Sequence, residues 1–184
     1  MARQWTPPSA WPRATAEVLF VVAWPVLSEA DDTALRRLRA QYHSRESGLI
    51  GPHFTLVYGA ALERESELRE ALERLQRRPF WFVLDRIVRF DQAPPSRAAY
   101  LFAVPGDGAA ELTELYEMLN PTPDGEVFEP HITLGLFERA ADAEQVARIV
   151  ERQHLPMHGR VESLGLLRRD GERLDTLATI RLGG

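Results

Sequence analysis

The sequence predicts an α+β domain with two lobes, built from two duplicated β-α-β-α-β halves whose antiparallel sheets flank a central cleft. Three observations support this prediction. Strand-like and helix-like segments alternate in the same order in residues 14–92 and 97–184, the two expected lobes. A short motif recurs at the same place in each half, and a hairpin signal adds a final strand. The 184 residues suit a single domain, with residues 1–13 as an N-terminal extension.

The first half opens on an apolar segment and then alternates between helical and extended patterns. We expect strand 17–25, helix 31–43, strand 51–58, helix 63–77 and strand 80–90. The first helix follows an Asp-Asp-Thr capping stretch, and the second carries Leu68, Leu72 and Leu75 as an apolar stripe. The segment "FWFVLDRIVRF" is β-branched and aromatic, as strands are.

The second half repeats this order. We expect strand 98–104, helix 109–119, strand 129–136, helix 142–153 and strand 158–168. Pro94 and Pro95 predict a joint between the halves. Asp170-Gly171, which separates two apolar segments, predicts a tight hairpin followed by one more strand.

Composition excludes several classes of function. The chain has no cysteine, which removes disulfides and thiolate metal sites and fits a reducing cytoplasm. All 22 basic residues are arginine, so chemistry through a lysine amine, including that of an ATP-dependent ligase charged on lysine, is excluded. The formal charge of −5 argues against a surface that coats duplex DNA, whereas a small nucleotide or a single RNA end remains compatible.

The longest apolar run, "VLFVVAWPVL" at 18–27, is too short to span a bilayer. A signal peptide is conceivable, but the preceding segment is long and rich in Pro and Trp, and Glu17 directly precedes the run. A buried strand is therefore the better interpretation. We expect a cytoplasmic protein without a membrane partner, and a monomer, because one chain can complete the cleft.

A repeated motif carries the chemistry. The segments "GPHFTLVYG" at 51–59 and "EPHITLGLF" at 129–137 share Pro, His, an apolar residue, Thr and Leu in the same order. Two of only five histidines fall into this frame, which chance would produce with odds of roughly one in two thousand. On a strand, His53 and Thr55 project from one face and their apolar neighbours from the other, and His131 and Thr133 do the same.

Two imidazoles and two hydroxyls across one cleft suit phosphodiester chemistry without a metal. One neutral ring can take a proton from the attacking oxygen, and one protonated ring can give a proton to the leaving oxygen, because histidine populates both forms near neutral pH. The threonine hydroxyls can donate to the non-bridging oxygens of the phosphate. Core repetition alone would preserve the apolar residues but not the histidines and threonines.

The doubled His-x-Thr-x frame resembles the signature of the 2H phosphoesterase superfamily, which includes the 2′-5′ RNA ligase / RNA 2′,3′-cyclic phosphodiesterase family. The resemblance covers essentially the whole chain. It implies a bilobal α+β fold, no cofactor, and opening of a 2′,3′-cyclic phosphate of a nucleotide or RNA end to a 2′-phosphate. It also implies that His53 and His131 are the acid–base pair, with Thr55 and Thr133 on the phosphate. We expect His131 as the base towards water and His53 as the acid towards the 3′-oxygen.

Further contacts with the substrate are less specific. Tyr58 and Phe137 follow the two motifs and can stack a base or sugar, although packing at the edge of a lobe would explain them equally. Four arginines are candidate phosphate contacts, with a solvated surface position as the alternative for each: Arg86, Arg89, Arg97 and Arg139.

Three alternatives stay open. The same acid–base pair can work in the 2′-5′ ligase direction, or the cleft can bind a nucleotide or RNA end without catalysis. A metal site is the third, but a catalytic zinc normally takes three protein ligands, and Glu129 is the only carboxylate near a motif histidine. His43 and His154 end predicted helices, where a positive ring suits the helix dipole, and His158 is expected to be structural.

Overall fold

The computed structural model describes residues 17–92, 98–121 and 128–183. Its strands are β1 (Val18–Leu27), β2 (Phe54–Ala60), β3 (Phe80–Asp91), β4 (Ala99–Pro105), β5 (Ile132–Phe137), β6 (Met157–Asp170) and β7 (Arg173–Arg181). The helices are α1 (Glu29–Tyr42), α2 (Ser44–Ser47), α3 (Glu65–Glu73), α4 (Ala109–Leu119) and α5 (Ala140–His154), with a 3-10 turn η1 at Leu62–Arg64. The predicted N-terminal extension 1–13 and the Pro94-Pro95 joint lie outside the described residues.

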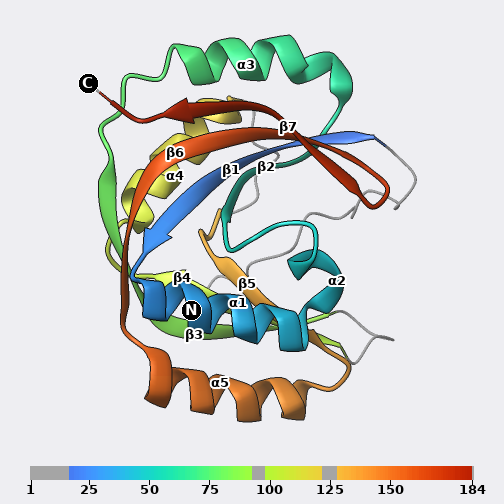
Figure 1. Cartoon of the computed structure of the whole chain (residues 1–184), viewed down its shortest axis with the longest axis vertical. Helices are drawn as coiled ribbons and strands as arrows, with labels where there is room; N and C mark the ends of the chain where they lie inside the picture. Colours follow the sequence, from blue (N-terminus) through green and yellow to red (C-terminus); the bar gives the residue numbers. More distant parts are fainter. Residues whose placement is uncertain (1–16, 93–97, 122–127, 184) are drawn as a thin grey trace.

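The seven strands form one antiparallel sheet, and the predicted α+β class is confirmed. The strand order is β2-β1-β6-β3-β4-β5, with β7 also paired to β6. The 14-residue strand β6 holds the sheet together, because its first part pairs with β3 and its second part with β7, while β1 runs along its other side. The sheet thus has two wings that share β6, drawn in the upper and lower parts of Figure 1.

Strands and helices are exchanged between the halves of the sequence. β1 of the first half pairs with β6 of the second, and β3 of the first half pairs with β4 of the second. In the same way, α1 packs on β5, and α4 packs on β2. Residues 14–92 and 97–184 are therefore not separate units of strand pairing. Their patterns predict strands and helices, but not which edges join.

Both motif strands occupy ends of this path. Among the described strands, β2 pairs with β1, with Thr55 opposite Val22, and β5 pairs with β4, with Thr133 opposite Phe102. Figure 1 shows β2 and β5 turned towards the middle of the molecule, between the two wings. The bend of the sheet therefore brings together motifs that lie farthest apart along its strand order.

The core fills the space between the sheet and its helices. It is built from buried apolar residues of β1 to β6 and of α1, α3, α4 and α5, and partly buried residues of β7 pack against it. Phe54 and Phe82 are fully buried and meet edge to face at 5.1 Å. Leu68 and Leu72, predicted as part of an apolar stripe, are both fully buried on α3. Burial of such side chains contributes roughly 1.5–3 kcal/mol each to stability.

The predicted elements are observed, with differences at their ends. The strands predicted to begin at 51 and 129 begin at Phe54 and Ile132, one residue after each motif histidine. Pro52 and Pro130 precede those histidines and have no N–H to donate to a neighbouring strand. The short helix α2 was not predicted, because four residues carry no periodic pattern.

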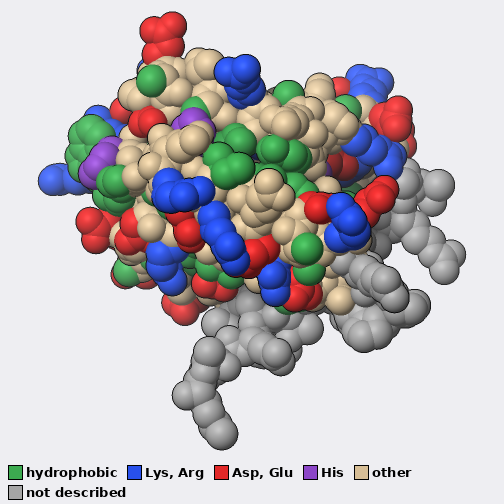
Figure 2. All heavy atoms as spheres, turned by 90° about the horizontal axis from the view of Figure 1, so that it is seen from below, with side chains coloured by type: hydrophobic (Ala, Val, Ile, Leu, Met, Phe, Trp, Pro, Cys, Tyr) green, Lys and Arg blue, Asp and Glu red, His purple; other side chains and the backbone are tan. Residues whose placement is uncertain are grey.

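The described surface shows no broad region of one charge on the face drawn in Figure 2, where arginines and acidic side chains are interspersed. In the described residues, several ion pairs join side chains four residues apart, such as Arg74 with Glu70 and Arg148 with Glu144. Across the described ranges, no helix combines the length and apolar character that a membrane crossing requires.

Candidate active site

The two motifs show the same alternation of faces. Phe54 and Leu56 on β2 are buried, as are Ile132 and Leu134 on β5. His53, Thr55, His131 and Thr133 are all partly exposed. The apolar residues of each motif thus anchor the strand in the core, and the polar residues face away from it.

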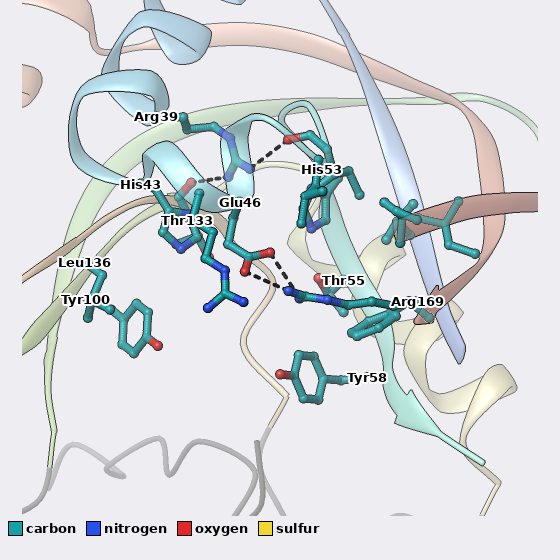
Figure 3. Close-up of a pocket in the computed structure, with 17 residues that line it drawn as sticks. Arg39, His43, Glu46, His53, Thr55, Tyr58, Tyr100, Thr133, Leu136 and Arg169 are labelled. Carbon is teal, nitrogen blue, oxygen red and sulfur yellow. Dashed lines mark hydrogen bonds and ion pairs between the residues drawn. The ribbon is translucent and has the colours of Figure 1, made fainter. Parts of the chain in front are cut away.

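A cavity of about 300 Å³ lies between the motif strands, at the lower end of the range for small-ligand sites. We call it the motif cavity. Figure 3 shows residues of its wall, which come from both wings. The lining residues are Phe20, Val22, Arg39, His43, Arg45, Glu46, Leu49, Ile50, His53, Thr55, Tyr58, Tyr100, Thr133, Leu136, Leu167, Arg169 and Leu174.

Three of the four motif residues line this cavity. His53 and Thr55 reach it from the β2 side and Thr133 from β5, whereas His131 is not part of its wall. The His131 ring packs on Phe102, with ring centroids 4.0 Å apart, and Phe102 in turn stacks on Tyr100. A positive charge on His131 would lower the pKa of His53.

The two histidines are held in the same way. Nδ1 of His53 lies 2.8 Å from the carbonyl oxygen of Gly51, and Nδ1 of His131 lies 2.7 Å from that of Glu129. A carbonyl oxygen can only accept, so Nδ1 carries the proton in both rings. Nε2 is therefore the nitrogen that gains or loses a proton in each ring.

Burial keeps both rings neutral in the unliganded protein. The pKa of His53 is lowered from 6.5 to about 4, mainly by burial, with the bond to Gly51 opposing this effect and the positive charge of Arg39 adding to it. Burial also lowers the pKa of His131, against the opposing effect of its bond to Glu129. A negative group placed between the rings would raise both pKa values, because it favours the charged imidazole.

A buried arginine joins the two motifs. Arg39 on α1 is 1% exposed, and its guanidinium donates to the carbonyl oxygens of Thr133 at 2.6 Å and Ile50 at 3.0 Å. One contact lies within the second motif, and the other lies three residues before His53 (Figure 3). On the opposite side, Asn120 at the end of α4 donates to the Leu56 carbonyl on β2 at 3.0 Å. Each motif strand is thus held by a helix from the other half of the sequence.

The cavity also has charged groups at its wall. Arg169 on β6 and Glu46 on α2 form a bidentate ion pair, with both N–O distances 3.1 Å. Three arginines and one glutamate line the cavity, which gives it a formal charge of +2, in contrast to −5 for the chain. The motif cavity is therefore positive in a negative protein and attracts anions.

Of the two aromatic residues predicted to contact the substrate, one lies at the motif cavity and one in the core. Tyr58 lines the motif cavity and meets Phe20 edge to face at 5.1 Å. Phe137 is 7% exposed and packs on Tyr42 within the core, where it has no access to this cavity. The core alternative is therefore correct for Phe137, because the even spacing from Ile132 and Leu134 is broken by a register shift of β5 against β4.

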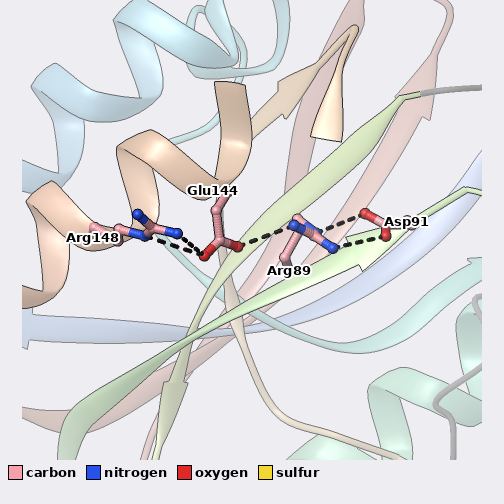
Figure 4. A network of polar contacts seen from close by, with 4 residues as sticks. All are labelled: Arg89, Asp91, Glu144 and Arg148. Atoms are coloured by element: carbon pink, nitrogen blue, oxygen red, sulfur yellow. Dashed lines mark hydrogen bonds and ion pairs between the residues drawn. The ribbon is translucent and has the colours of Figure 1, made fainter. Parts of the chain in front are cut away.

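The predicted arginine contacts lie elsewhere. Arg139 pairs with Asp142 at the start of α5, and Arg86 pairs with Asp85. Neither lines the motif cavity. Figure 4 shows Arg89 between Asp91 and Glu144, in a network that ties β3 to α5. Arg97 lies outside the described residues.

Five arginine, glutamate or histidine residues of the cavity wall were not predicted as parts of the site: Arg39, His43, Arg45, Glu46 and Arg169. A signal existed for Arg39, because it follows Leu35 by four residues and so shares the buried face of α1. His43 was assigned to the helix end, and its side chain also reaches the cavity. The Glu46–Arg169 pair joins residues 123 apart in sequence, and no local pattern indicates it.

Among residues 17–92, 98–121 and 128–183, no group of three or more His, Cys, Asp or Glu side chains is arranged to hold a metal ion.

Comparison with known proteins identifies the family. A family model described as the 2'-5' RNA ligase superfamily matches residues 26–173. No curated protein gives a match. Among solved structures, E. coli LigT complexed with 3'-AMP is 20% identical, with a TM-score of 0.58 and coverage of 91% of this chain and 99% of LigT.

LigT in its apo form is 22% identical, with a TM-score of 0.57 and coverage of 92% of this chain and 100% of LigT. Kluyveromyces marxianus Usb1 is 12% identical, with a TM-score of 0.52 and coverage of 90% and 99%. At these identities the structures show a shared fold. The match over residues 26–173, in a chain with two His-x-Thr motifs, supports phosphodiesterase-type chemistry and shows that the chain belongs to the 2'-5' RNA ligase superfamily, the 2H phosphoesterases.

Proposed function

We propose that this protein opens 2′,3′-cyclic phosphates of nucleotides or RNA ends to 2′-phosphates without a metal ion. One observation carries the proposal: the two motifs offer matched histidines, each with Nδ1 bonded to the carbonyl two residues earlier. Thr55 and Thr133 line the same cavity from opposite strands. Duplicated apolar packing would not require this matching of the polar groups.

The reaction follows from the roles of the two rings. Water attacks phosphorus while the neutral imidazole takes one of its protons through Nε2. The bond from phosphorus to the 3′-oxygen breaks, and the protonated imidazole gives its Nε2 proton to that oxygen. The product is a 2′-phosphate with a free 3′-hydroxyl. The hydroxyls of Thr55 and Thr133 donate to the non-bridging oxygens and hold phosphorus between the rings.

Binding of the substrate supplies the proton that the acid needs. Both rings are neutral in the free protein because burial lowers their pKa values. The negative charge of the cyclic phosphate favours protonation of one ring. The positive charge of Arg39 lowers the pKa of His53 in addition to burial, which disfavours the protonated form of this ring. We therefore propose His131 as the acid and His53 as the base, the reverse of the assignment expected from sequence.

The ligase direction is the second candidate, because the family model that matches is named for 2'-5' RNA ligases. Joining a 2′,3′-cyclic end to a 5′-hydroxyl uses the same two rings in the same roles, because the 5′-hydroxyl attacks phosphorus in place of water and the 3′-oxygen still leaves. Tyr58, which lines the cavity, is the proposed contact with the nucleoside in both directions.

A substrate panel tests the proposal. It contains 2′,3′-cyclic mononucleotides, RNA ending in a cyclic phosphate with and without a 5′-hydroxyl acceptor, ADP-ribose 1″,2″-cyclic phosphate and 2′-5′ oligoadenylate. Products are resolved as 2′- or 3′-phosphates or as joined RNA. We expect 2′-phosphates, in reactions that exhaustive EDTA treatment does not slow.

Matched variants assign the residues. His53→Asn and His131→Asn should each lower the rate at least 10²-fold, the lower range for loss of a general acid or base. His158→Asn, at an exposed position on β6, is the control and should retain activity. Unchanged hydrolysis in both motif variants would refute the proposal, and binding of a cyclic nucleotide without turnover would favour a non-catalytic module.

A further inference from the structure

The pair Glu46–Arg169 offers a second anion site in the motif cavity. Nε of Arg169 donates to the Gly171 carbonyl at 2.9 Å, which fixes the guanidinium beside the β6–β7 turn. Its two remaining nitrogens face both carboxylate oxygens of Glu46. Figure 3 shows the two side chains meeting at the cavity wall, in the region of Thr55 and Tyr58.

This fork of donors suits a phosphoryl group as well as a carboxylate. A guanidinium presents parallel N–H groups that match two oxygens of either anion. Glu46 therefore occupies the position that two phosphoryl oxygens would take. The arginine side chain is 21% exposed and the glutamate 27%, so an anion can reach them from the cavity side.

The partner of Arg169 is held less firmly than Arg169 itself. Glu46 lies on α2, a helix of four residues without a side-chain cap, whereas Arg169 lies within the 14-residue strand β6. Arg45, beside Glu46, also lines the cavity and pairs with Glu172 at 3.3 Å. Movement of the Glu46 carboxylate would leave Arg169 in place with its fork open to the cavity.

The charge of the cavity favours such an exchange. Three arginines and one glutamate give a formal charge of +2, and one cyclic phosphodiester carries a charge of −1. Arg39 is buried and donates to two backbone carbonyls, which leaves Arg169 and Arg45 as cavity cations for a second anion. A substrate with one phosphate leaves part of this charge unbalanced.

We propose that Arg169 binds a second phosphoryl group, the one on the 5′-oxygen of the nucleoside whose 2′,3′-cyclic phosphate is opened, and that Glu46 holds this site in the unliganded protein. This inference rests on the proposed function and specifies its substrate class. The 5′-phosphoryl group comes either from a 5′-phosphomonoester of a mononucleotide or from the internucleotide phosphodiester of an RNA end. A nucleoside 2′,3′-cyclic phosphate with a free 5′-hydroxyl lacks this second phosphoryl group and should bind more weakly.

Binding of product-like ligands tests the site without turnover. Isothermal titration calorimetry compares adenosine 2′-phosphate with adenosine 2′,5′-bisphosphate at one fixed salt concentration. The wild-type protein should bind the bisphosphate about fivefold to tenfold more tightly, since the new charge-assisted bonds are offset by the loss of the Glu46 pair. Arg169→Gln should bring the ratio close to one, and Glu46→Gln should raise it, because the arginine no longer has a competing partner.

Controls separate this site from general charge effects. Arg168→Gln removes the same charge from the neighbouring position of β6, where Arg168 pairs with Asp175 outside the cavity, and should keep the wild-type ratio. Arg169→Lys keeps the positive charge but lacks the bidentate guanidinium. It serves as a second variant in case Arg169→Gln does not fold. The dinucleotide ApA with a terminal 2′-phosphate distinguishes the sources: tight binding identifies an RNA end, and tight binding of the bisphosphate alone identifies a mononucleotide.

The outcomes are distinct. Equal binding of the two adenosine phosphates by the wild-type protein, or a ratio that survives in Arg169→Gln, would overturn the inference and leave the proposed function standing. A lower ratio in Glu46→Gln would also overturn it. Failure of adenosine 2′-phosphate and the bisphosphate alike to bind would count against the proposed function itself, and this inference would fall with it.

Discussion

Lowering the pH from 7 to 5 should weaken the fold through the histidines at the motif cavity. Burial lowers the pKa of His53 and of His43 from 6.5 to about 4. Between those values, the unfolded chain binds a proton at each histidine that the folded protein does not bind. Stability is therefore present above pH 6.5, falls as the pH drops through 6.5, and levels off near pH 4.

The size of the effect follows from the same two values. For one histidine with a pKa of 6.5 unfolded and about 4 folded, the loss between pH 7 and pH 5 is roughly 2 kcal/mol. Urea denaturation followed by circular dichroism at both pH values measures the free energy of unfolding. His53→Asn removes one contribution, so the variant should lose roughly 2 kcal/mol less than the wild type over this interval.

Comparison between variants isolates the histidine from the carboxylates, which also protonate as the pH falls. His158→Asn, at an exposed site, should lose as much stability as the wild type between the two pH values. If His53→Asn shows the same pH dependence as the wild type, the pKa of this ring is not lowered in the folded protein, and the argument for a neutral base fails with it.

Three further outcomes are expected. Arg39→Lys keeps the charge but cannot bond both carbonyls with one planar guanidinium. Since a hydrogen bond to a charged group contributes about 1.5–3 kcal/mol, urea denaturation should show a loss of about 2 kcal/mol, and steady-state kinetics should show a lower kcat with a smaller change in KM. An unchanged kcat would show that Arg39 does not position the motifs. A substrate with sulfur in place of the 3′-bridging oxygen has a leaving group that needs no acid. The hydrolysis rate of His131→Asn on this substrate should therefore recover towards wild type, while that of His53→Asn should not. The opposite pattern would restore the assignment expected from sequence. Gly135→Ala would place a Cβ 2.6 Å from the Cβ of Tyr42. Thermal or urea denaturation should therefore show that the free energy of unfolding falls by about 1–3 kcal/mol. A variant as stable as the wild type would mean that α1 does not pack so closely on β5.

Sequence patterns predict local structure here and fail for contacts between distant segments. The duplicated motifs, with Phe54 and Ile132 buried beside partly exposed histidines, follow from the two-residue period of a strand. The pairing of β1 with β6 does not, because antiparallel edges of similar composition offer equivalent partners.

The same limit applies to the candidate site. The histidines and threonines stood out because they are repeated, whereas the partner of Arg169 is 123 residues away. Arg139 and Arg89 seemed equally suited to phosphate until the structure showed each beside its own carboxylate. Tyr58 lines the motif cavity, and so does Leu136, which occupies the matching position after the second motif. Phe137 follows Leu136 and packs on Tyr42 of α1 instead.

The long strand β6 has a consequence for how the protein is made. β1 is synthesised well before residues 159–169, with which it pairs, so the part of the sheet that contains β1 and β2 stays incomplete until those residues have been made. Neither half, expressed alone, has the edges it needs, and we expect such fragments to aggregate or to fold only when supplied together. Distant pairing of this kind also slows folding. Because β6 joins β1 and β2 to β3, β4 and β5, the motif cavity would then form only after β6 is in place.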